Sequence, residues 1–157
     1  MLNINQFRDL IVRPALHDLM LYSIDAEELL VFTCANESLG GTFIHQVDGP
    51  ALGIFQMEPA TYNDLWQNYI KSNGRLMMIL FSNFMVNSVP AEERMIYDIR
   101  FATAMARLFY ARIAEPLPSA MDENAIYSYY KRYYNTSLGA ANQEQAISKY
   151  HLFRSSR

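Results

Sequence analysis

The sequence predicts a mostly α-helical fold in a single domain. Apolar residues recur at spacings of three and four along most of the chain, as they do on the buried side of a helix. Residues 42–57 lack that period, and their glycines, proline and β-branched residues predict a loop that holds at most a short β-hairpin. With 157 residues, of which 51% are hydrophobic, the chain is long enough for one sizeable core and too short for two. We therefore expect one domain over residues 1–157.

The first helical segment is predicted over residues 4–22, where Pro14 removes a backbone hydrogen bond and should kink or split the helix. The second is predicted over residues 25–38. Asp25 marks its start as part of a possible capping box. Gly40, followed by a second glycine, marks its end, because glycine is free to take a positive φ.

Five more helical segments are predicted after the loop. Pro59, a good first-turn residue, starts one of them, and Asn73 with the next glycine ends it. Residues 75–86 are so apolar that we expect a helix buried on most of its surface. Residues 91–113 keep helical register long enough to form a long central helix. The five segments are residues 59–72, 75–86, 91–113, 121–134 and 142–151.

The composition argues against several kinds of partner. The net charge is -3 and the basic residues are scattered, so nucleic acid is not an expected partner. The lone Cys34 excludes an intramolecular disulfide, as expected of a protein made in a reducing cytoplasm, and is predicted to be a core residue. The histidines lack the spacing of metal ligands, so we expect no metal site, and we expect no cofactor. They are His17, His45 and His151.

The N-terminal residues 1–9 carry amides and charges where a secretion signal would be apolar. No apolar run reaches the roughly 18 residues that a membrane span needs. We therefore expect synthesis in the cytoplasm without a signal peptide and no integral membrane association. If the substrate lies outside the cytoplasm, another component must deliver the protein to it.

Glu37 lies where an amphipathic helix should be apolar. If residues 25–38 are helical at about 100° per residue, Ala26 and Leu30 fall within roughly 20° of the direction of Glu37. A carboxylate on a hydrophobic stripe loses hydration, so its pKa should rise and it can hold a proton at neutral pH, as a general acid must. The alternative is that the last turn frays and Glu37 turns into water.

Two motifs follow one another around this residue: Glu37-Ser38, and then Gly-Ile-Phe-Gln-Met-Glu-Pro-Ala-Thr at residues 53–61. Together they resemble the soluble lytic transglycosylase and goose-type lysozyme superfamily. Its members have Glu-Ser at the end of a helix, then Gly-Leu-Met-Gln and Met-Pro-Ala-Thr. Here Glu58 stands before the proline, where methionine is common. The resemblance implies a lysozyme-like fold.

Phage-encoded members of the superfamily resemble this chain over most of its length. Their motifs correspond here to Ser23–Ala26, Glu37-Ser38, Gly49–Gly53, Phe55–Pro59 and Tyr134-Asn135. The C-terminal motif departs from the usual Tyr-Asn-Ala-Gly and leaves open whether Tyr133 or Tyr134 faces the site. The resemblance implies a phage protein that acts on the cell wall in the periplasm. It would be either an endolysin delivered with a holin or a component of the virion.

By that resemblance Glu37 is both catalytic acid and catalytic base. It would protonate the glycosidic oxygen between N-acetylmuramic acid and N-acetylglucosamine in peptidoglycan. It would then take a proton from the C6 hydroxyl of the muramyl residue, which attacks its own anomeric carbon and gives a 1,6-anhydro product. One carboxylate suffices for that route, whereas most glycosidases need two.

Five further residues are candidates for substrate binding. Gln56 can donate and accept hydrogen bonds and so can orient an acetamido group, and Phe55 precedes it in the motif. Ser38 can steady the neighbouring carboxylate. Tyr130 and Tyr134 share one helical face, from which a ring can pack on a sugar and a phenol can reach Glu37. For each of these residues the alternative is a structural role, and for the tyrosines it is a place in the core.

Two rival functions remain open. In the first, Asp48 is a second carboxylate that activates water, which would make the protein a hydrolytic muramidase. Its alternative role is that of a turn residue before Gly49. In the second, the protein keeps the fold without turnover, as a virion structural or glycan-binding protein.

Overall fold

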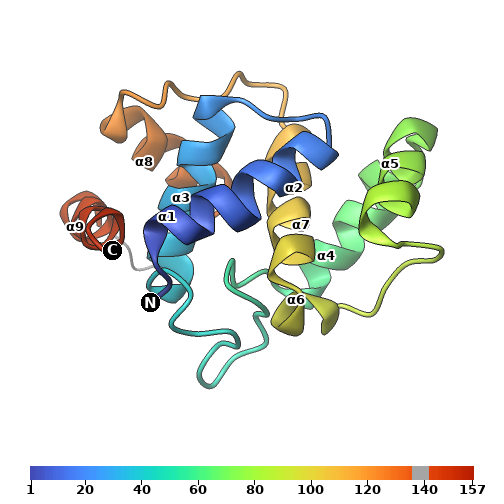
Figure 1. Ribbon diagram of the computed structural model, residues 1–157, viewed down its shortest axis with the longest axis horizontal. Coiled ribbons are helices and arrows are strands. Elements are labelled where there is room, and N and C mark those ends of the chain that lie inside the picture. Colours follow the sequence, from blue (N-terminus) through green and yellow to red (C-terminus); the bar gives the residue numbers. More distant parts are fainter. Residues whose placement is uncertain (136–141) are drawn as a thin grey trace.

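The computed structural model describes residues 1–135 and 142–157, and most of this part is helical (Figure 1). The prediction of a mostly α-helical fold is confirmed. α5 and α9 lie at opposite ends of the molecule (Figure 1). The elements are α1 Ile4–Gln6, the π-helical η1 Phe7–Val12, α2 Arg13–Asp18, α3 Ile24–Ser38, α4 Pro59–Leu65, the π-helical η2 Trp66–Ile70, α5 Gly74–Phe84, α6 Arg94–Tyr97, α7 Ile99–Ala111, α8 Glu123–Tyr133 and α9 Gln143–Arg154.

The loop over residues 42–57 contains two isolated antiparallel bridges in place of a hairpin. They join His45 to Leu52, and Leu52 to Met57. Because Leu52 pairs on both sides, the loop folds back on itself twice. The lysozyme-like identity of the whole fold stays a prediction from the motifs.

The helix that contains Pro14 is widened and not split. α1, η1 and α2 follow one another without a break (Figure 1). Proline has no N–H, so an α-helix would lose the hydrogen bond to the carbonyl of Leu10. Before the proline the backbone adopts π-helical hydrogen bonding, in which the N–H of Arg13 donates to the carbonyl of Arg8, five residues back. The helical path therefore continues through the proline.

α3 occupies the centre of the fold and is buried on almost every side. It packs against η1, α7, α8 and α9. Of its 15 residues, 11 are buried, including Ala26 and Leu30 from the predicted apolar stripe. The predicted central segment, residues 91–113, also lies in the core: α7 packs against η1, α2, α3, α4 and α6, and 10 of its 13 residues are buried.

The start of α3 differs from the prediction, and its end agrees with the prediction in part. The side chain of Ser23 accepts a hydrogen bond from the N–H of Ala26 at 3.0 Å and is the N-cap. Asp25 instead accepts from the N–H of Ala120 at 2.7 Å, which ties the connection between α7 and α8 to the start of α3. At the other end Leu39 takes the left-handed conformation, with φ 50°, and Gly40 and Gly41 follow with φ 61° and 80°, the positive values predicted for glycines here.

Residues 91–113 form two helices, and the prediction of one long helix here is wrong. The break falls at Asp98, whose side chain accepts from the N–H of Phe101 at 2.9 Å and so caps α7. Its carboxylate also pairs with Arg94, from α6, at 2.9 Å. A capping aspartate competes with the continuous helical hydrogen bonds, and here it starts a new helix.

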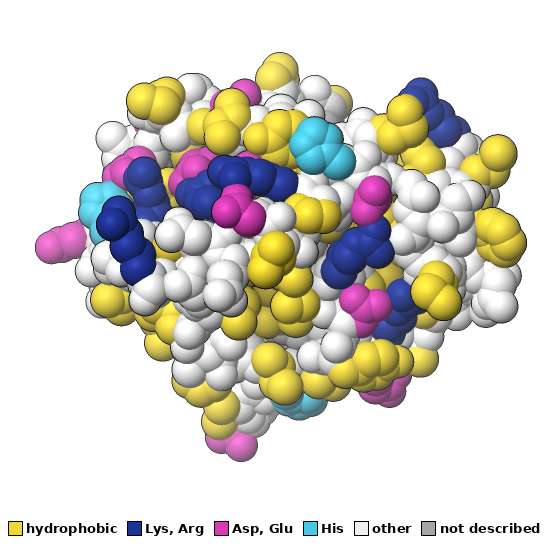
Figure 2. Space-filling model, in the orientation of Figure 1, with side chains coloured by type: hydrophobic (Ala, Val, Ile, Leu, Met, Phe, Trp, Pro, Cys, Tyr) yellow, Lys and Arg dark blue, Asp and Glu magenta, His cyan; other side chains and the backbone are white. Residues whose placement is uncertain are grey.

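α5 is exposed along its outer face, which corrects the prediction for residues 75–86. The side chains of Met78 and Phe81 are 73% and 61% exposed. α5 lies at the edge of the molecule, where hydrophobic side chains reach the surface (Figures 1 and 2). Its buried residues are Leu76, Leu80 and Phe84. Neither α5 nor any other helix in the described part of the chain is long and apolar enough to cross a membrane.

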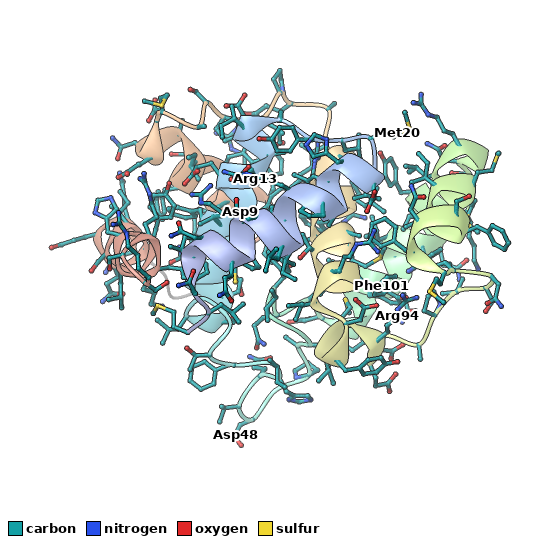
Figure 3. All side chains as sticks on the ribbon, in the orientation of Figure 1. Asp9, Arg13, Met20, Asp48, Arg94 and Phe101 are labelled. Atoms are coloured by element: carbon teal, nitrogen blue, oxygen red, sulfur yellow. The ribbon has the colours of Figure 1, made fainter. Side chains whose placement is uncertain are left out.

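A buried ionic cluster fixes α3 against the N-terminal helix and α9. Glu27, whose side chain is fully buried, accepts hydrogen bonds from Arg8 at 2.7 Å and from Arg13 at 2.8 Å (Figure 3 labels Arg13). Glu28 pairs with Arg8 at 2.8 Å and accepts the hydroxyl of Tyr150, from α9. Buried charges are tolerated when they are paired in this way.

Candidate active site

A cleft of about 900 Å³ opens beside the last turn of α3. The other segments that line it are the loop over residues 42–57, α4, the C-terminal end of α7, and the end of α8 with the two residues that follow. The lining residues are Glu37, Gln46, Ala51, Gln56, Met57, Glu58, Ala60, Thr61, Asp64, Phe109, Arg112, Tyr133, Tyr134 and Asn135. Carboxyl, amide and phenol groups thus alternate with apolar surface, a mixture that suits sugar rings with their hydroxyls and C–H faces.

Glu37 stands in the cleft at the end of the buried helix, as its sequence position predicted. The hydroxyl of Tyr130 donates to its Oε1 at 2.6 Å, and the side-chain amide of Asn135 donates to the same oxygen at 3.5 Å. Burial raises the pKa of Glu37 above its ordinary value, and the two hydrogen bonds offset that effect only in part. The carboxyl is therefore suited to hold a proton.

The two oxygens of Glu37 have different surroundings. Both hydrogen bonds fall on Oε1, and Oε2 has no hydrogen-bond partner within residues 1–135 and 142–157. Burial and the negative charge of Glu37 raise the pKa of Tyr130, so its phenol keeps its proton and remains a donor. Since Oε1 accepts from Tyr130, a proton on the carboxyl belongs on Oε2.

The three tyrosines at the end of α8 have separate partners. Tyr130 is buried, and its hydroxyl donates to Glu37. Tyr134 lines the cleft, but its hydroxyl donates to the backbone carbonyl of Phe55 at 2.8 Å. Tyr133 also lines the cleft, and its hydroxyl donates to Glu115 at 2.5 Å. The phenol that reaches Glu37 is thus that of Tyr130, while Tyr133 and Tyr134 both present surface to the cleft.

The Gly-Ile-Phe-Gln motif contributes Gln56 to one wall of the cleft. Gln56 lines it with a left-handed backbone, φ 45°, and its side-chain amide donates to the carbonyl of Gly53 at 2.8 Å. The side chain of Phe55 is buried in the core, and only its carbonyl serves the site, as the acceptor for Tyr134. Of these two candidates, therefore, Gln56 is placed to touch a ligand and Phe55 is not.

Ser38 and Asp48 lie outside the cleft. Ser38 is fully buried; its hydroxyl donates to the carbonyl of Cys34 at 3.1 Å and accepts from the N–H of Gly41 at 2.9 Å. Its hydroxyl therefore satisfies the backbone at the end of α3 and makes no hydrogen bond to the carboxyl of Glu37. Asp48 is exposed at the tip of the loop, with φ 57°, and points away from the body of the molecule (Figure 3).

Sequence reasoning did not assign several lining residues to the site, among them Asn135, Phe109, Asp64 and Arg112. Asn135 lies in the Tyr-Asn motif, so the resemblance carried a signal for it. Phe109 lies within residues 91–113, whose helical register gave no signal for a place in the site. Asp64 and Arg112 form an ion pair at 2.5 Å although 48 positions separate them, and nothing local to either residue marks that pairing.

No family model, no curated protein and no solved structure matches this chain. The resemblance to the lytic transglycosylase and goose-type lysozyme superfamily therefore rests on the motifs alone and stays a prediction. In the part of the chain that the structure describes, no group of three or more His, Cys, Asp or Glu side chains is placed to hold a metal ion.

Proposed function

We propose that the protein is a lytic transglycosylase that cleaves the bond between N-acetylmuramic acid and N-acetylglucosamine in peptidoglycan. The observation that carries this proposal is the state of Glu37, a carboxyl with a raised pKa that lines a cleft and is held on one oxygen by Tyr130. A general acid for glycoside cleavage needs this combination. The two motifs supply the substrate class by resemblance.

In the first step Oε2 of Glu37 gives its proton to the glycosidic oxygen. The bond from that oxygen to C1 of the muramyl residue breaks, and the N-acetylglucosamine side leaves as an alcohol. In the second step the Glu37 carboxylate takes the proton of the C6 hydroxyl, and O6 bonds to C1 to close the 1,6-anhydro ring. Glu37 ends protonated and no water is consumed. Between the steps Tyr130 stabilises the carboxylate through its hydrogen bond.

The walls of the cleft suit the two sugars. Tyr133 and Tyr134 can pack against C–H faces. Gln56 donates its amide N–H to Gly53, which leaves its side-chain carbonyl oxygen to accept the N–H of an acetamido group. Asp48 lies outside the cleft and so is not placed to act as the second carboxylate of a hydrolase. Glu58 and Asp64 line the cleft, but a transglycosylase needs neither of them as a second carboxylate.

Mass spectrometry of digested peptidoglycan tests the proposal directly. The expected products carry 1,6-anhydromuramic ends. Glu37→Gln keeps the size of the side chain but holds no acidic proton, and it should lower the rate by a factor of about 10³ or more. Asp48→Asn is the matched control and should retain activity, because Asp48 does not line the cleft.

Two other results would replace the proposal. Reducing muramic ends would identify a hydrolytic muramidase. Glycan binding without any turnover by the unmodified protein would identify a structural or glycan-binding protein. The phage setting, as endolysin or as virion component, is proposed from the motifs only.

A further inference from the structure

Arg112 is the only cation among the described residues that line the cleft. If the proposed function holds, neutral sugars occupy this space, and they do not require a guanidinium. The muramyl residue, however, carries a stem peptide, joined as an amide to its lactyl group, and this peptide brings carboxylates to the strand. A cation at one side of the cleft therefore matches the part of the substrate that distinguishes peptidoglycan from other polysaccharides.

The guanidinium of Arg112 is held in one position. Its Nη1 donates to Asp64 at 2.5 Å, and the group lies over the ring of Phe109 at 4.7 Å. Asp64 is itself fixed, since it accepts from Asn68 at 2.6 Å. The Arg112 side chain remains 26% exposed. A cation that is positioned in advance and still accessible loses little conformational entropy when it binds an anion.

Arg112 also has N–H donors that no described residue engages. A guanidinium carries five N–H groups, and Asp64 engages only Nη1. Nε and Nη2 have no hydrogen-bond partner among the described residues. That edge can take a carboxylate through two parallel hydrogen bonds, the strongest arrangement for such a pair. The ligand would therefore join the Asp64 pair and would not need to displace it.

We propose that Arg112 binds a carboxylate of the stem peptide on the muramyl residue, so that the enzyme prefers peptide-bearing strands to bare glycan. This inference rests on the proposed function, and it assigns Arg112 a role in specificity and not in the chemical step.

The experiment compares two preparations of glycan from the same sacculi, one with its stem peptides and one stripped by an amidase. Because the amidase frees a lactyl carboxylate on each muramyl residue, these carboxylates are then capped as methyl amides. For the unmodified protein, KM should be about tenfold lower on the peptide-bearing strands, the size expected of a hydrogen-bonded charge pair. Arg112→Gln should lose this preference through a rise in KM for the peptide-bearing strands, because the interaction is made in the bound substrate and not only in the transition state.

Arg100→Gln is the matched control. Arg100 stands at the other end of α7, pairs with Asp18 and lies over the ring of Phe84 at 4.4 Å, but it does not line the cleft. This variant should keep the preference. Equal KM values of the unmodified protein for the two glycans, or a preference that survives in Arg112→Gln, would overturn the inference. If the unmodified protein cleaves neither glycan, the proposed function fails, and the ratio of equilibrium binding constants for the same two glycans decides the role of Arg112.

Discussion

At the scale of single residues, the contact between Tyr130 and Glu37 controls the acidity of the proposed site. The hydrogen bond favours the charged form of Glu37, so it lowers a pKa that burial raises. Tyr130→Phe removes the donor, and the pKa of Glu37 should rise further. Because the first step needs protonated Glu37, the alkaline limb of the profile of kcat/KM against pH should move to higher pH. We also expect kcat to fall about tenfold, since the carboxylate loses a charged hydrogen bond.

Tyr129→Phe provides the control for this pH profile. Tyr129 is the preceding buried residue of α8, and its hydroxyl donates to the carbonyl of Glu115 at 3.1 Å. Removing that hydroxyl should leave the alkaline limb where it is. An equal shift in both variants would show that packing of the helix, and not the contact with Glu37, sets the pH dependence.

A residue of the site could be predicted from the sequence where its own helix or motif carries the signal. Glu37 could be predicted because its own helix places it beside apolar residues. A spacing of three and four puts Tyr130 and Tyr134 on one face, but it does not say which phenol reaches a residue 93 positions away. The pairing of Asp64 with Arg112 depends on how α4 and α7 meet, which no short motif encodes.

At the scale of elements, the wall of the cleft depends on Gly53. Its φ is 72°, and an added Cβ would lie 2.3 Å from the carbonyl oxygen of Met95, a backbone atom that cannot swing aside. Gly53→Ala should therefore reduce the free energy of unfolding by about 1–3 kcal/mol. It should also weaken glycan cleavage, because the side chain of Gln56 is anchored on the Gly53 carbonyl.

Urea unfolding and the turnover assay check this prediction with Gly74→Ala as the control. A Cβ at Gly74, the first residue of α5, meets nothing within 4 Å. That variant should change neither stability nor activity appreciably. Equal stability of the two variants would show that the loop accommodates the added methyl group by moving.

The positions of the helices were predictable, but their surroundings were not. Each helix in the described part of the chain overlaps a segment with helical period, because that period is a local property. Burial depends on what packs around the helix. α5 is apolar on most sides yet lies at an edge, whereas α3 is enclosed. The break at Asp98 depends on whether an aspartate caps a new helix or faces solvent, and both occur in helical sequences.

At the scale of the whole molecule, the ionic cluster at Glu27 makes the fold sensitive to acid. Burial alone would raise the pKa of Glu27, but hydrogen bonds from Arg13 and Arg8 hold it below its ordinary value of 4.5. A carboxyl with a lowered pKa in the folded state stabilises the fold above its unfolded pKa. That contribution is lost as the pH falls through the folded value. We therefore expect the stability that Glu27 provides to be complete at neutral pH and to decline below about 4.5.

Glu27→Gln tests this contribution. At pH 7 it should lower the free energy of unfolding by about 3–5 kcal/mol, because Arg8 and Arg13 lose the buried carboxylate they share. It should also flatten the decline in acid, since glutamine does not titrate. Urea unfolding at pH 7 and pH 3 measures both effects. Asp9→Asn, at the exposed partner of Arg13, is the control and should have a small effect. If Glu27→Gln were no more destabilising than Asp9→Asn, hydrophobic packing alone would have to position α3, and with it the carboxyl at its far end.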